Sequence, residues 1–319
     1  MRLWATIEEI PHDLRSCVLT IGVFDGVHRG HAQLIRRTVA EARTRDVPAV
    51  LMTFEPHPAA VVFRTPPPAR LTTSAHKIDL VAELGIDAFL VVAFSAAFAA
   101  TPAEQFVQDE LVERLHVASV VVGANFTYGY RGSGTVATLA EAGQRYGFAV
   151  DAMPLAGVGG AVVSATTIRN LIGAGDVVQA AQLLGRPFRC DGVIVRGEQR
   201  GRALGYPTAN VDMAADSAVP ADGVYAGRVV GLDGSGRATG EVLGNTAISV
   251  GSNPTFDGRH RTVEAFILDF DDDLYGRRLG VEFSHRLRGM VKFDSVEALI
   301  KQMDADVLRT RELMTTPSI

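Results

Sequence analysis

The first half of the chain alternates short apolar runs with amphipathic segments, and this alternation most constrains its fold. Five apolar runs of strand length occupy residues 17–24, 49–54, 88–94, 118–124 and 148–154. Four segments with helical periodicity lie between or beside them, at about 31–45, 76–85, 103–115 and 138–147. Strands that alternate with helices predict an α/β domain with a Rossmann-like parallel sheet, covered by helices on both faces. Such sheets bind ligands at the carboxyl ends of their strands, where the strand order reverses.

Two helix starts carry a recognisable pattern of capping residues. Thr101 and Glu104 have the spacing of a capping box, with Pro102 at the first helical position. Asp294 and Glu297 have the same spacing before the last helix, which is expected at about 295–314. Both patterns predict a helix whose first turn is capped by a side chain.

The pattern changes near residues 184–187, where helical periodicity stops. Short β-like runs then appear between Gly, Asp and Pro turns, at 190–197, 224–232, 239–251, 262–270 and 278–288. With no helices between them, these runs are expected to pair antiparallel, as a small barrel or a sandwich, followed by the C-terminal helix. The 319 residues, 47% of them hydrophobic, are enough for two cores. The sequence therefore predicts two domains of different class, 1–184 and 185–319.

Composition excludes several classes of protein. The net charge of −5 argues against a general nucleic-acid-binding surface. No apolar run reaches the length of a membrane span, and the first residues lack the apolar core and cleavage site of a signal peptide. The two cysteines, Cys17 and Cys190, are far apart, which argues against a disulfide framework or a cysteine-zinc site. We expect a cytoplasmic protein without membrane or nucleic-acid partners, and either a monomer or a weak homo-oligomer.

The sharpest motif is the segment 22–31, Gly-Val-Phe-Asp-Gly-Val-His-Arg-Gly-His, which follows a predicted strand and opens a helix. Unpaired backbone amides at a helix start attract anions. Gly26 and Gly30 allow the backbone to approach a ligand without an intervening side chain. His28 and His31 are three residues apart, so their imidazoles share one face of the first turn. Two histidines placed there can donate hydrogen bonds to phosphate oxygens as negative charge develops.

Two histidines near a helix start also have interpretations other than phosphate binding. A single histidine near a helix start is usually part of the polar surface. Zinc-binding pairs on helices are more often four residues apart beside a glutamate, and no third ligand is evident near His28 and His31 in the sequence. Two histidines that flank a glycine at a strand-to-helix junction favour a phosphate site.

The segment 22–31 resembles the HxGH nucleotidylyltransferase superfamily and, within it, the bacterial bifunctional riboflavin kinase/FAD synthetases. Three further blocks that resemble this family follow in the expected order, at 53–58, 122–129 and 163–169. In the last block Ala165 stands where a second serine is common, which leaves the role of that position open.

The resemblance implies transfer of AMP from ATP to FMN, with Mg²⁺ accompanying ATP. It implies that His28 and His31 are catalytic and hold the triphosphate. Further nucleotide or phosphate contacts are implied for Gly22, Phe24, Asp25, Gly26, Gly30, Asn125, Ser164, Thr166 and Arg169. Flavin contacts are implied for Phe54, Pro56, His57, Phe126 and Tyr128. An alternative for residues 53–58 is a rigid turn bounded by prolines that contacts no ligand.

The second half contains a glycine-punctuated loop, 197–210, that ends in Pro207-Thr208-Ala209-Asn210. Loops between strands are commonly rich in Gly and Pro, so this composition is weak evidence by itself. The Thr208 hydroxyl and the Asn210 amide carbonyl are hard oxygen ligands of the kind that a magnesium nucleotide takes. The sequence lacks a GxxxxGK[ST] phosphate-binding loop, so a kinase here must hold phosphate in another way.

The Pro-Thr-Ala-Asn block resembles the riboflavin kinase family, and blocks at 220–225, 253–256 and 261–264 support it. The resemblance implies that Thr208 and Asn210 bind the metal. It implies nucleotide or phosphate contacts for Gly201, Arg202, Gly205 and Pro207, and a flavin contact for Arg288. In isolation, Glu264 is an exposed glutamate of an alternating strand. By resemblance, it is the catalytic base that accepts the proton of the riboflavin 5′-hydroxyl.

Two rival functions remain. One is an HxGH adenylyltransferase for another phosphorylated substrate, such as a pantetheine phosphate, with a regulatory barrel; the blocks around Asn210 and Glu264 argue against it. The other is a non-catalytic barrel that binds flavin or RNA, which predicts a basic, aromatic-rich face. The second half instead has many aspartates and few aromatic residues. We expect an enzyme that uses ATP, riboflavin and FMN, with the kinase in the C-terminal half.

Overall fold

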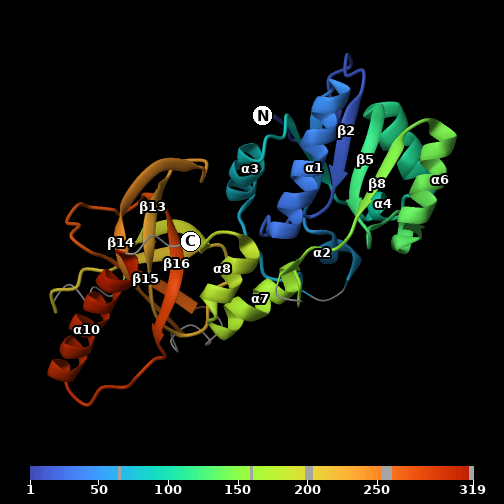
Figure 1. The fold of residues 1–319 in the computed structure, drawn as a ribbon. Helices are drawn as coiled ribbons and strands as arrows, with labels where there is room; N and C mark the ends of the chain where they lie inside the picture. The colour runs from blue at the N-terminus through green and yellow to red at the C-terminus, as the bar shows by residue number, and fades with distance from the viewer. Residues whose placement is uncertain (64–65, 159–160, 198–203, 253–260, 316–319) are drawn as a thin grey trace. The chain divides into compact units, whose positions relative to one another are not determined.

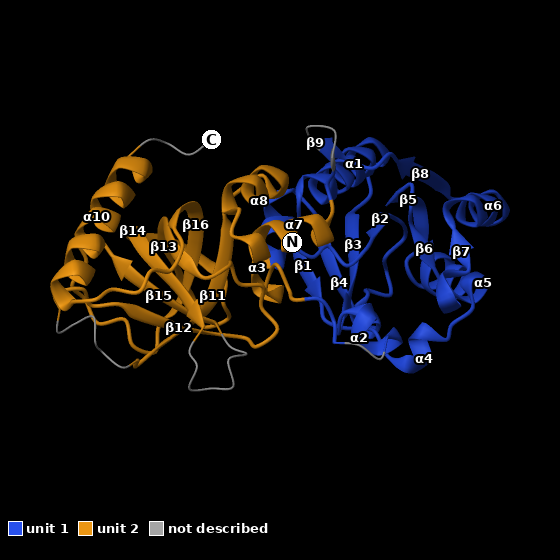
Figure 2. Cartoon of the chain, turned by 90° about the horizontal axis from the view of Figure 1, so that it is seen from below, with its two compact units in different colours: residues 1–68, 77–163 blue, residues 69–76, 164–319 orange. Residues whose placement is uncertain are grey.

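The computed structural model describes residues 1–63, 66–158, 161–197, 204–252 and 261–315 (Figure 1). The chain divides into two compact units, each with its own core (Figure 2). Unit 1 comprises Met1–Pro68 and Lys77–Val163, and unit 2 comprises Ala69–His76 and Ser164–Ile319. The division of function expected at residues 184/185 stays a prediction.

Unit 1 is built on a six-stranded parallel sheet in the order β1-β4-β3-β2-β5-β8. Its strands are β1 (Arg2–Trp4), β2 (Cys17–Ile21), β3 (Ala49–Glu55), β4 (Ala88–Ala93), β5 (Val117–Gly123) and β8 (Ala149–Met153). The Rossmann-like parallel sheet is therefore confirmed, with β1 as an additional edge strand. Apart from β1, the chain order runs outward from β2, through β3 and β4 on one side and through β5 and β8 on the other, so the reversal lies between β2 and β5.

Both faces of this sheet are buried, as the continuous apolar runs predict. Leu19 and Ile21 of β2 pack with the helix α6 (Val136–Tyr146) and the helical segment formed by α5 (Ala103–Phe106) and η2 (Val107–Arg114). Val18, the residue before Leu19, points to the other face and packs there with α1 (Arg29–Arg45) and α3 (Ser74–Glu83). The sheet is thus a rigid base that fixes the loops at its strand ends.

Both predicted capping boxes are wrong. The N-cap of α5 is Pro102, which makes no side-chain cap hydrogen bond. The Glu104 carboxylate instead accepts hydrogen bonds from Arg145 and the Tyr146 hydroxyl, both at 2.7 Å. The last helix, α10 (Val296–Met314), is capped by Ser295, whose hydroxyl accepts from the amide of Ala298 at 3.1 Å. The capping residue therefore lies one position after Asp294.

Unit 2 is built on a closed antiparallel barrel in the order β11-β12-β15-β14-β13-β16, with α10 packed outside β13 and β14. The choice between a barrel and a sandwich is thereby decided. Its strands are β11 (Phe188–Val195), β12 (Ala209–Met213), β13 (Gly223–Leu232), β14 (Ala238–Ser252), β15 (Arg261–Ile267) and β16 (Arg278–Arg288). The helices α7 (Ala165–Ala174) and α8 (Val177–Leu184) precede the barrel.

Shorter elements connect these parts. They are η1 (Ile7–Glu9), α2 (Pro58–Val62), α4 (Ala96–Ala99), β6 (Thr127–Tyr128), η3 (Tyr130–Gly132), β7 (Gly134–Thr135), β9 (Gly157–Val158) and β10 (Ala161–Val162). Within the described ranges, no helix has both the length and the apolar character needed to cross a membrane. Cys17 and Cys190 are free and buried. Burial raises the pKa of both thiols, which keeps them protonated and unreactive.

Candidate active sites

The first candidate site lies where β2, β3 and β5 end. These strands are neighbours and parallel, so their carboxyl ends meet at one edge of the sheet. The segment 22–31 leaves β2 there, residues 56–58 follow β3, and residues 124–127 follow β5. The reversal of strand order thus falls at the motif singled out from the sequence.

The two histidines of this site are in direct contact. His28 is the N-cap of α1, and its Nδ1 accepts a hydrogen bond from the backbone amide of His31 at 3.2 Å. The rings stack with centroids 3.6 Å apart and planes at 15°, so the expected common face is confirmed. Because Nδ1 of His28 is an acceptor, neutral His28 carries its proton on Nε2. That nitrogen is the one suited to donate to a phosphate oxygen.

The loop before α1 has an unusual backbone. Phe24 and Val27 have φ angles of 51° and 37°, in the left-handed region that side chains disfavour. The ring of Phe24 meets that of His31 edge-on at 5.1 Å. A Cβ on Gly30 would lie 3.2 Å from Cε1 of His28, so the glycine leaves room for the imidazole to lie over the helix start.

Two buried side chains hold the carbonyl of Val23 in this loop. The Thr53 hydroxyl donates to it at 3.1 Å and the Lys77 ammonium at 2.9 Å. Lys77 was missed in the sequence. The only available signal was a lysine at the start of the predicted helix 76–85, and a surface position explains such a lysine equally well.

Three of the predicted flavin contacts, Phe54, Phe126 and Tyr128, belong to one continuous aromatic cluster. Three rings that sequence reasoning missed complete it: Phe94, Phe98 and Phe106. Neighbouring centroids in the cluster are 5.4 to 6.1 Å apart. Phe106 and Tyr128 are buried in the core of unit 1, whereas Phe54, Phe98 and Phe126 are partly buried and pack against it. A partly exposed ring can stack against a planar heteroaromatic molecule.

The remaining predicted residues of unit 1 occupy the same strand ends. His57 caps α2, its Nδ1 accepting from the amide of Ala59 at 3.1 Å, and Pro56 is exposed beside it. Asn125 is exposed in the turn after β5. Gly22, Asp25 and Gly26 lie in the loop between β2 and α1, where Asp25 is buried and Gly26 has a φ of 80°. Their ligand contacts stay predictions.

Ser164, Thr166 and Arg169 lie in unit 2, at the start of α7. The Ser164 hydroxyl caps this helix by accepting from the amide of Thr167 at 3.1 Å. Ala165 is the first helical residue, and Thr166 is exposed. Nε of Arg169 donates to the carbonyl of Ala69 at 2.7 Å. The predicted phosphate contacts of these residues remain predictions.

The second candidate site lies on the outer face of the barrel, on β12 and β15. Glu264 is half-buried, whereas its neighbours Val263 and Ala265 are buried inside the barrel. The Thr208 hydroxyl donates to Oε2 of Glu264 at 3.3 Å, and Asn210 is paired directly opposite Glu264 in the ladder. The structure therefore brings together a hydroxyl, an amide and a carboxylate that were singled out separately.

The end of the glycine-punctuated segment is a strand rather than a loop. Ala209 and Asn210 begin β12, which was missed because its apolar residues are few and alternate with Asn and Asp. A Cβ on Gly197 would lie 2.4 Å from Nδ2 of Asn210, so the glycine lets the amide lie against the backbone. Gly205, with a φ of 86°, and Pro207 are exposed ahead of β12. Gly201, Arg202 and the block 253–256 lie outside the described residues.

Arg288, the remaining predicted flavin contact, is bound to α10. Its Nε and Nη2 donate to the carboxylate of Asp306 at 3.0 and 2.7 Å, and Gln302 donates to the same carboxylate at 3.0 Å. The two charged side chains are only 19% and 9% exposed. Arg288 thus ties β16 to the helix, and its flavin contact stays a prediction.

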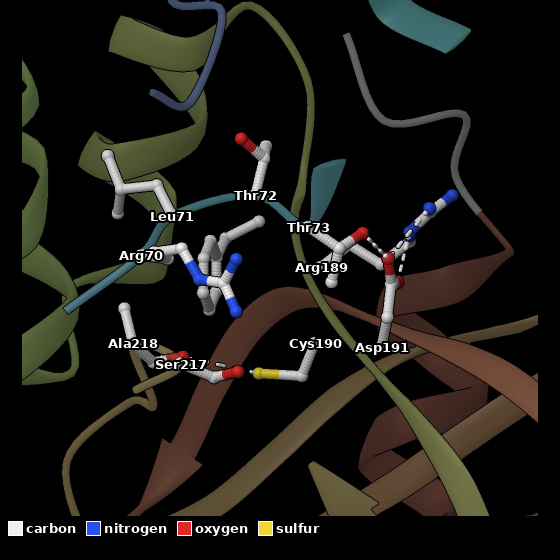
Figure 3. A pocket seen from close by; sticks show the side chains of 10 residues that line it. Arg70, Leu71, Thr72, Thr73, Arg189, Cys190, Asp191, Ser217 and Ala218 are labelled. Carbon is white, nitrogen blue, oxygen red and sulfur yellow. Dashed lines mark hydrogen bonds and ion pairs between the residues drawn. The ribbon is translucent and has the colours of Figure 1, made fainter. Parts of the chain in front are cut away.

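A pocket elsewhere in unit 2 contains none of the predicted site residues (Figure 3). It lies between the segment 70–73, the start of β11 and residues 217–218. Arg189 and Asp191 form a buried ion pair at 2.6 Å at its side, and the Thr73 hydroxyl donates to Asp191 at 2.9 Å. These contacts anchor the segment 69–76 on the barrel.

In the part of the chain that the structure describes, no group of three or more His, Cys, Asp or Glu side chains is arranged to hold a metal ion. The zinc interpretation of His28 and His31 therefore gains no third ligand of these types among the described residues.

Two family models cover most of the chain. Residues 10–167 match the model of FAD synthetase, and residues 184–314 match the model of riboflavin kinase. The first contains His28, His31 and the aromatic cluster, and the second contains the paired strands β12 and β15 that carry Asn210 and Glu264.

Individual proteins are similar over nearly the whole chain. A bifunctional riboflavin kinase/FMN adenylyltransferase of Escherichia coli K12 is 38% identical over 95% of both chains. One from Pseudomonas fluorescens is 37% identical over 98% of both. A crystal structure of a Streptococcus pneumoniae protein, described as a macrolide-efflux protein, has a TM-score of 0.86 at 31% identity, covering 97% of this chain and 98% of that one. By its sequence and by both of its matched domains, the chain belongs to the family of bifunctional riboflavin kinase/FMN adenylyltransferases.

Proposed function

We propose that residues 185–319 phosphorylate riboflavin to FMN and that residues 1–184 transfer AMP from ATP to FMN, giving FAD and pyrophosphate. The two activities are those of the family, and the proposal assigns them to the two sites described above. A cytoplasmic location is part of the proposal. The two buried free thiols support it, because disulfides are rare in that compartment.

The adenylyl transfer needs no nucleophile from the protein. An oxygen of the FMN phosphate attacks the α-phosphorus of ATP, the bond from that phosphorus to the bridging oxygen breaks, and pyrophosphate leaves. Catalysis then consists of alignment and neutralisation of the developing charge. The contact between His28 and His31 carries this assignment, because it occupies Nδ1 of His28 as an acceptor and so leaves Nε2 as the proton-bearing nitrogen at the start of α1, where a helix favours anions.

Flavin binding in the first site is assigned to the aromatic cluster. The partly buried rings of Phe54 and Phe126 and the buried ring of Tyr128 are assigned to contact the planar ring system of the flavin. Burial raises the pKa of Tyr128, so its hydroxyl stays protonated. Asn125, next to Phe126 at the end of β5, is assigned to orient the FMN phosphate. Ser164, Thr166 and Arg169 are assigned to the departing pyrophosphate.

The kinase reaction requires a base. Glu264 accepts the proton of the riboflavin 5′-hydroxyl, the hydroxyl oxygen attacks the γ-phosphorus of ATP, and ADP leaves as the bond to its bridging oxygen breaks. The hydrogen bond between Thr208 and Glu264, with Asn210 opposite, carries this assignment. Glu264 therefore lies beside two side chains whose oxygens suit a nucleotide-bound cation, which supports the assignment.

The donor set of the second site fits a magnesium ion. Thr208 supplies a hydroxyl oxygen and Asn210 an amide oxygen, which are hard ligands of the type that Mg²⁺ takes together with ATP phosphates. When bound, the ion would neutralise phosphate charge during transfer. Phosphate contacts are assigned to Gly201, Arg202, Gly205 and Pro207, and a flavin contact to Arg288.

A time course of all three flavins tests the proposal. Purified protein with riboflavin, ATP and Mg²⁺ should convert riboflavin through FMN to FAD. Chromatography of samples taken over time measures the three flavins. Glu264→Ala should abolish FMN formation while FAD still forms from supplied FMN. His28→Ala or His31→Ala should lower FAD formation by about 100-fold or more while FMN still forms.

The two sets of variants control each other, because each should retain the activity of the other site. Near-normal FAD formation in both histidine variants would overturn the first assignment. Loss of both activities in Glu264→Ala would overturn the separation of the sites. Wild-type protein that converts neither riboflavin nor FMN would contradict the proposed function altogether.

A further inference from the structure

Tyr206 makes two contacts immediately ahead of the kinase site. Its hydroxyl donates a hydrogen bond to Asp304 of α10, and its ring meets Phe266 of β15 at a centroid distance of 5.2 Å and an angle of 65°. The hydrogen bond to Asp304 raises the pKa of Tyr206 to about 12, so the hydroxyl remains a donor at physiological pH. The Tyr206 side chain therefore links the segment just before β12 to the strand β15 and to the helix α10.

These contacts are in register with the proposed catalytic pair. Phe266 lies two residues after Glu264 on β15, and Tyr206 lies two residues before Thr208. Glu264 and Phe266 alternate with buried residues and so share the outer face of β15. Each contacts a side chain of the segment that leads antiparallel into β12: Thr208 for Glu264 and Tyr206 for Phe266. A shift of the backbone at Tyr206 would consequently move the Thr208 hydroxyl relative to the Glu264 carboxylate.

The helix that carries Asp304 is itself fixed on the barrel. Arg288 and Asp306 join it to β16, and Arg311 donates two hydrogen bonds of 2.7 Å to Asp269 just beyond β15. Asp304 is therefore presented by a well-anchored element. In the segment before β12, Gly205 and Pro207 flank Tyr206, and neither has a side chain that could anchor this segment by a hydrogen bond.

We infer that Tyr206 is a positioning residue of the kinase site, which holds the start of β12 against Phe266 and Asp304 so that Thr208 meets Glu264. This inference rests on the proposed kinase function of that site. Tyr206 acts through Thr208 rather than on the substrate. Its loss should therefore weaken binding of the magnesium nucleotide more than it lowers the rate at saturation.

The test is steady-state kinetics of riboflavin phosphorylation by full-length variants. Tyr206→Phe removes only the hydroxyl, and the KM for ATP should rise about 3- to 10-fold with kcat changed less than about 3-fold, the range expected for one lost hydrogen bond. Tyr206→Ala also removes the ring contact and should raise the KM further. Asp304→Ala should match Tyr206→Phe, whereas Asp304→Asn keeps an acceptor oxygen and should lie nearer to wild type.

Two controls separate positioning from general damage. FAD formation from FMN, measured in the same preparations, should stay at the wild-type rate. Arg309→Gln, which breaks an exposed ion pair with Glu312 on the same helix, should leave both activities unchanged. The double variant Tyr206→Phe/Asp304→Ala should be no worse than either single variant, because the same contact is lost in each case.

The outcomes separate this inference from the proposed function. A wild-type KM for ATP in Tyr206→Phe, in protein that makes FMN, would overturn the positioning role alone. Equal losses in both activities would also overturn it, because they indicate destabilisation of the chain. Wild-type protein that makes no FMN would overturn the kinase function and the inference with it.

Discussion

The ammonium group of Lys77 donates a hydrogen bond to the backbone carbonyl of Val23 at 2.9 Å, in the loop that leads to the two histidines. The Thr53 hydroxyl donates to the same carbonyl at 3.1 Å. The next residue, Phe24, has a left-handed φ of 51°, a conformation that surrounding contacts must maintain. Lys77 therefore supports the backbone that directs His28 and His31.

Replacing Lys77 with methionine tests this support. Lys77→Met keeps the apolar stem and removes the donor, and FAD formation from FMN should fall roughly 10-fold or more, as expected for a lost hydrogen bond from a charged group. Lys77→Arg retains a cationic donor and serves as the matched control. Riboflavin phosphorylation in the same protein should not change. Unaltered FAD formation in Lys77→Met would show that the Thr53 hydroxyl alone holds the loop.

The architecture of unit 1 was predictable because its strands are buried on both faces. Strands such as β2 and β3 appear in the sequence as unbroken apolar runs, and this pattern distinguishes them from surface strands. Strand β1 was missed because it has three residues and only Trp4 is buried. Strand β12 was missed because polar residues alternate with its few apolar ones. Both helix caps were wrong because Ser, Thr and Asp compete locally, and tertiary contacts such as that of Glu104 with Arg145 decide between them.

The candidate sites were predictable where their chemistry is local in sequence. His28 and His31, or Thr208 and Asn210, are recognisable from spacing alone. Residues that act through distant partners had no such signal. Lys77 contacts a loop about fifty residues earlier, and Asp304 contacts Tyr206 about one hundred residues earlier. Only the fold brings these pairs together.

Removing one partner of the ion pair between Arg288 and Asp306 should cause a large loss of stability. Arg288→Met leaves the Asp306 carboxylate in a site where it is only 9% exposed, and the free energy of unfolding of the barrel should fall by about 3–5 kcal/mol. Denaturation in urea measures the effect. The double variant Arg288→Met/Asp306→Leu should recover part of the loss, since no charge is then buried alone. A double variant less stable than Arg288→Met would contradict this explanation.

We expect the burial of His76 to make the free energy of unfolding depend on pH. Its burial, and then the charges of Arg189 and Arg186, hold its pKa well below the usual value. The unfolded chain, with a histidine pKa near 6.5, therefore binds the proton more readily than the folded chain. The stability from keeping His76 neutral is fully present above about pH 6.5 and is lost as the pH falls below it.

The melting temperature between pH 7.5 and 5 measures this effect. His76→Gln is neutral at every pH, so its melting temperature should fall less on acidification than that of wild type. The difference between the two proteins isolates His76 from carboxylates that titrate in the same range. Identical curves would show that the folded protein accepts a proton at this position without cost.

Substitution of Gly227 tests the packing of the barrel that supports the kinase site. A Cβ on this residue of β13 would lie 1.8 Å from the carbonyl oxygen of Glu282 on β16 and 2.8 Å from Cδ1 of Ile248. Because neither the β16 backbone nor the packed core can move aside, Gly227→Ala should destabilise the barrel by about 3 kcal/mol or more. Gly234→Ala is the matched control, since a Cβ there meets nothing within 4 Å. Urea denaturation and FMN formation should show the loss in Gly227→Ala and not in Gly234→Ala, and equal stability of the two variants would refute the close approach of β13 to β16.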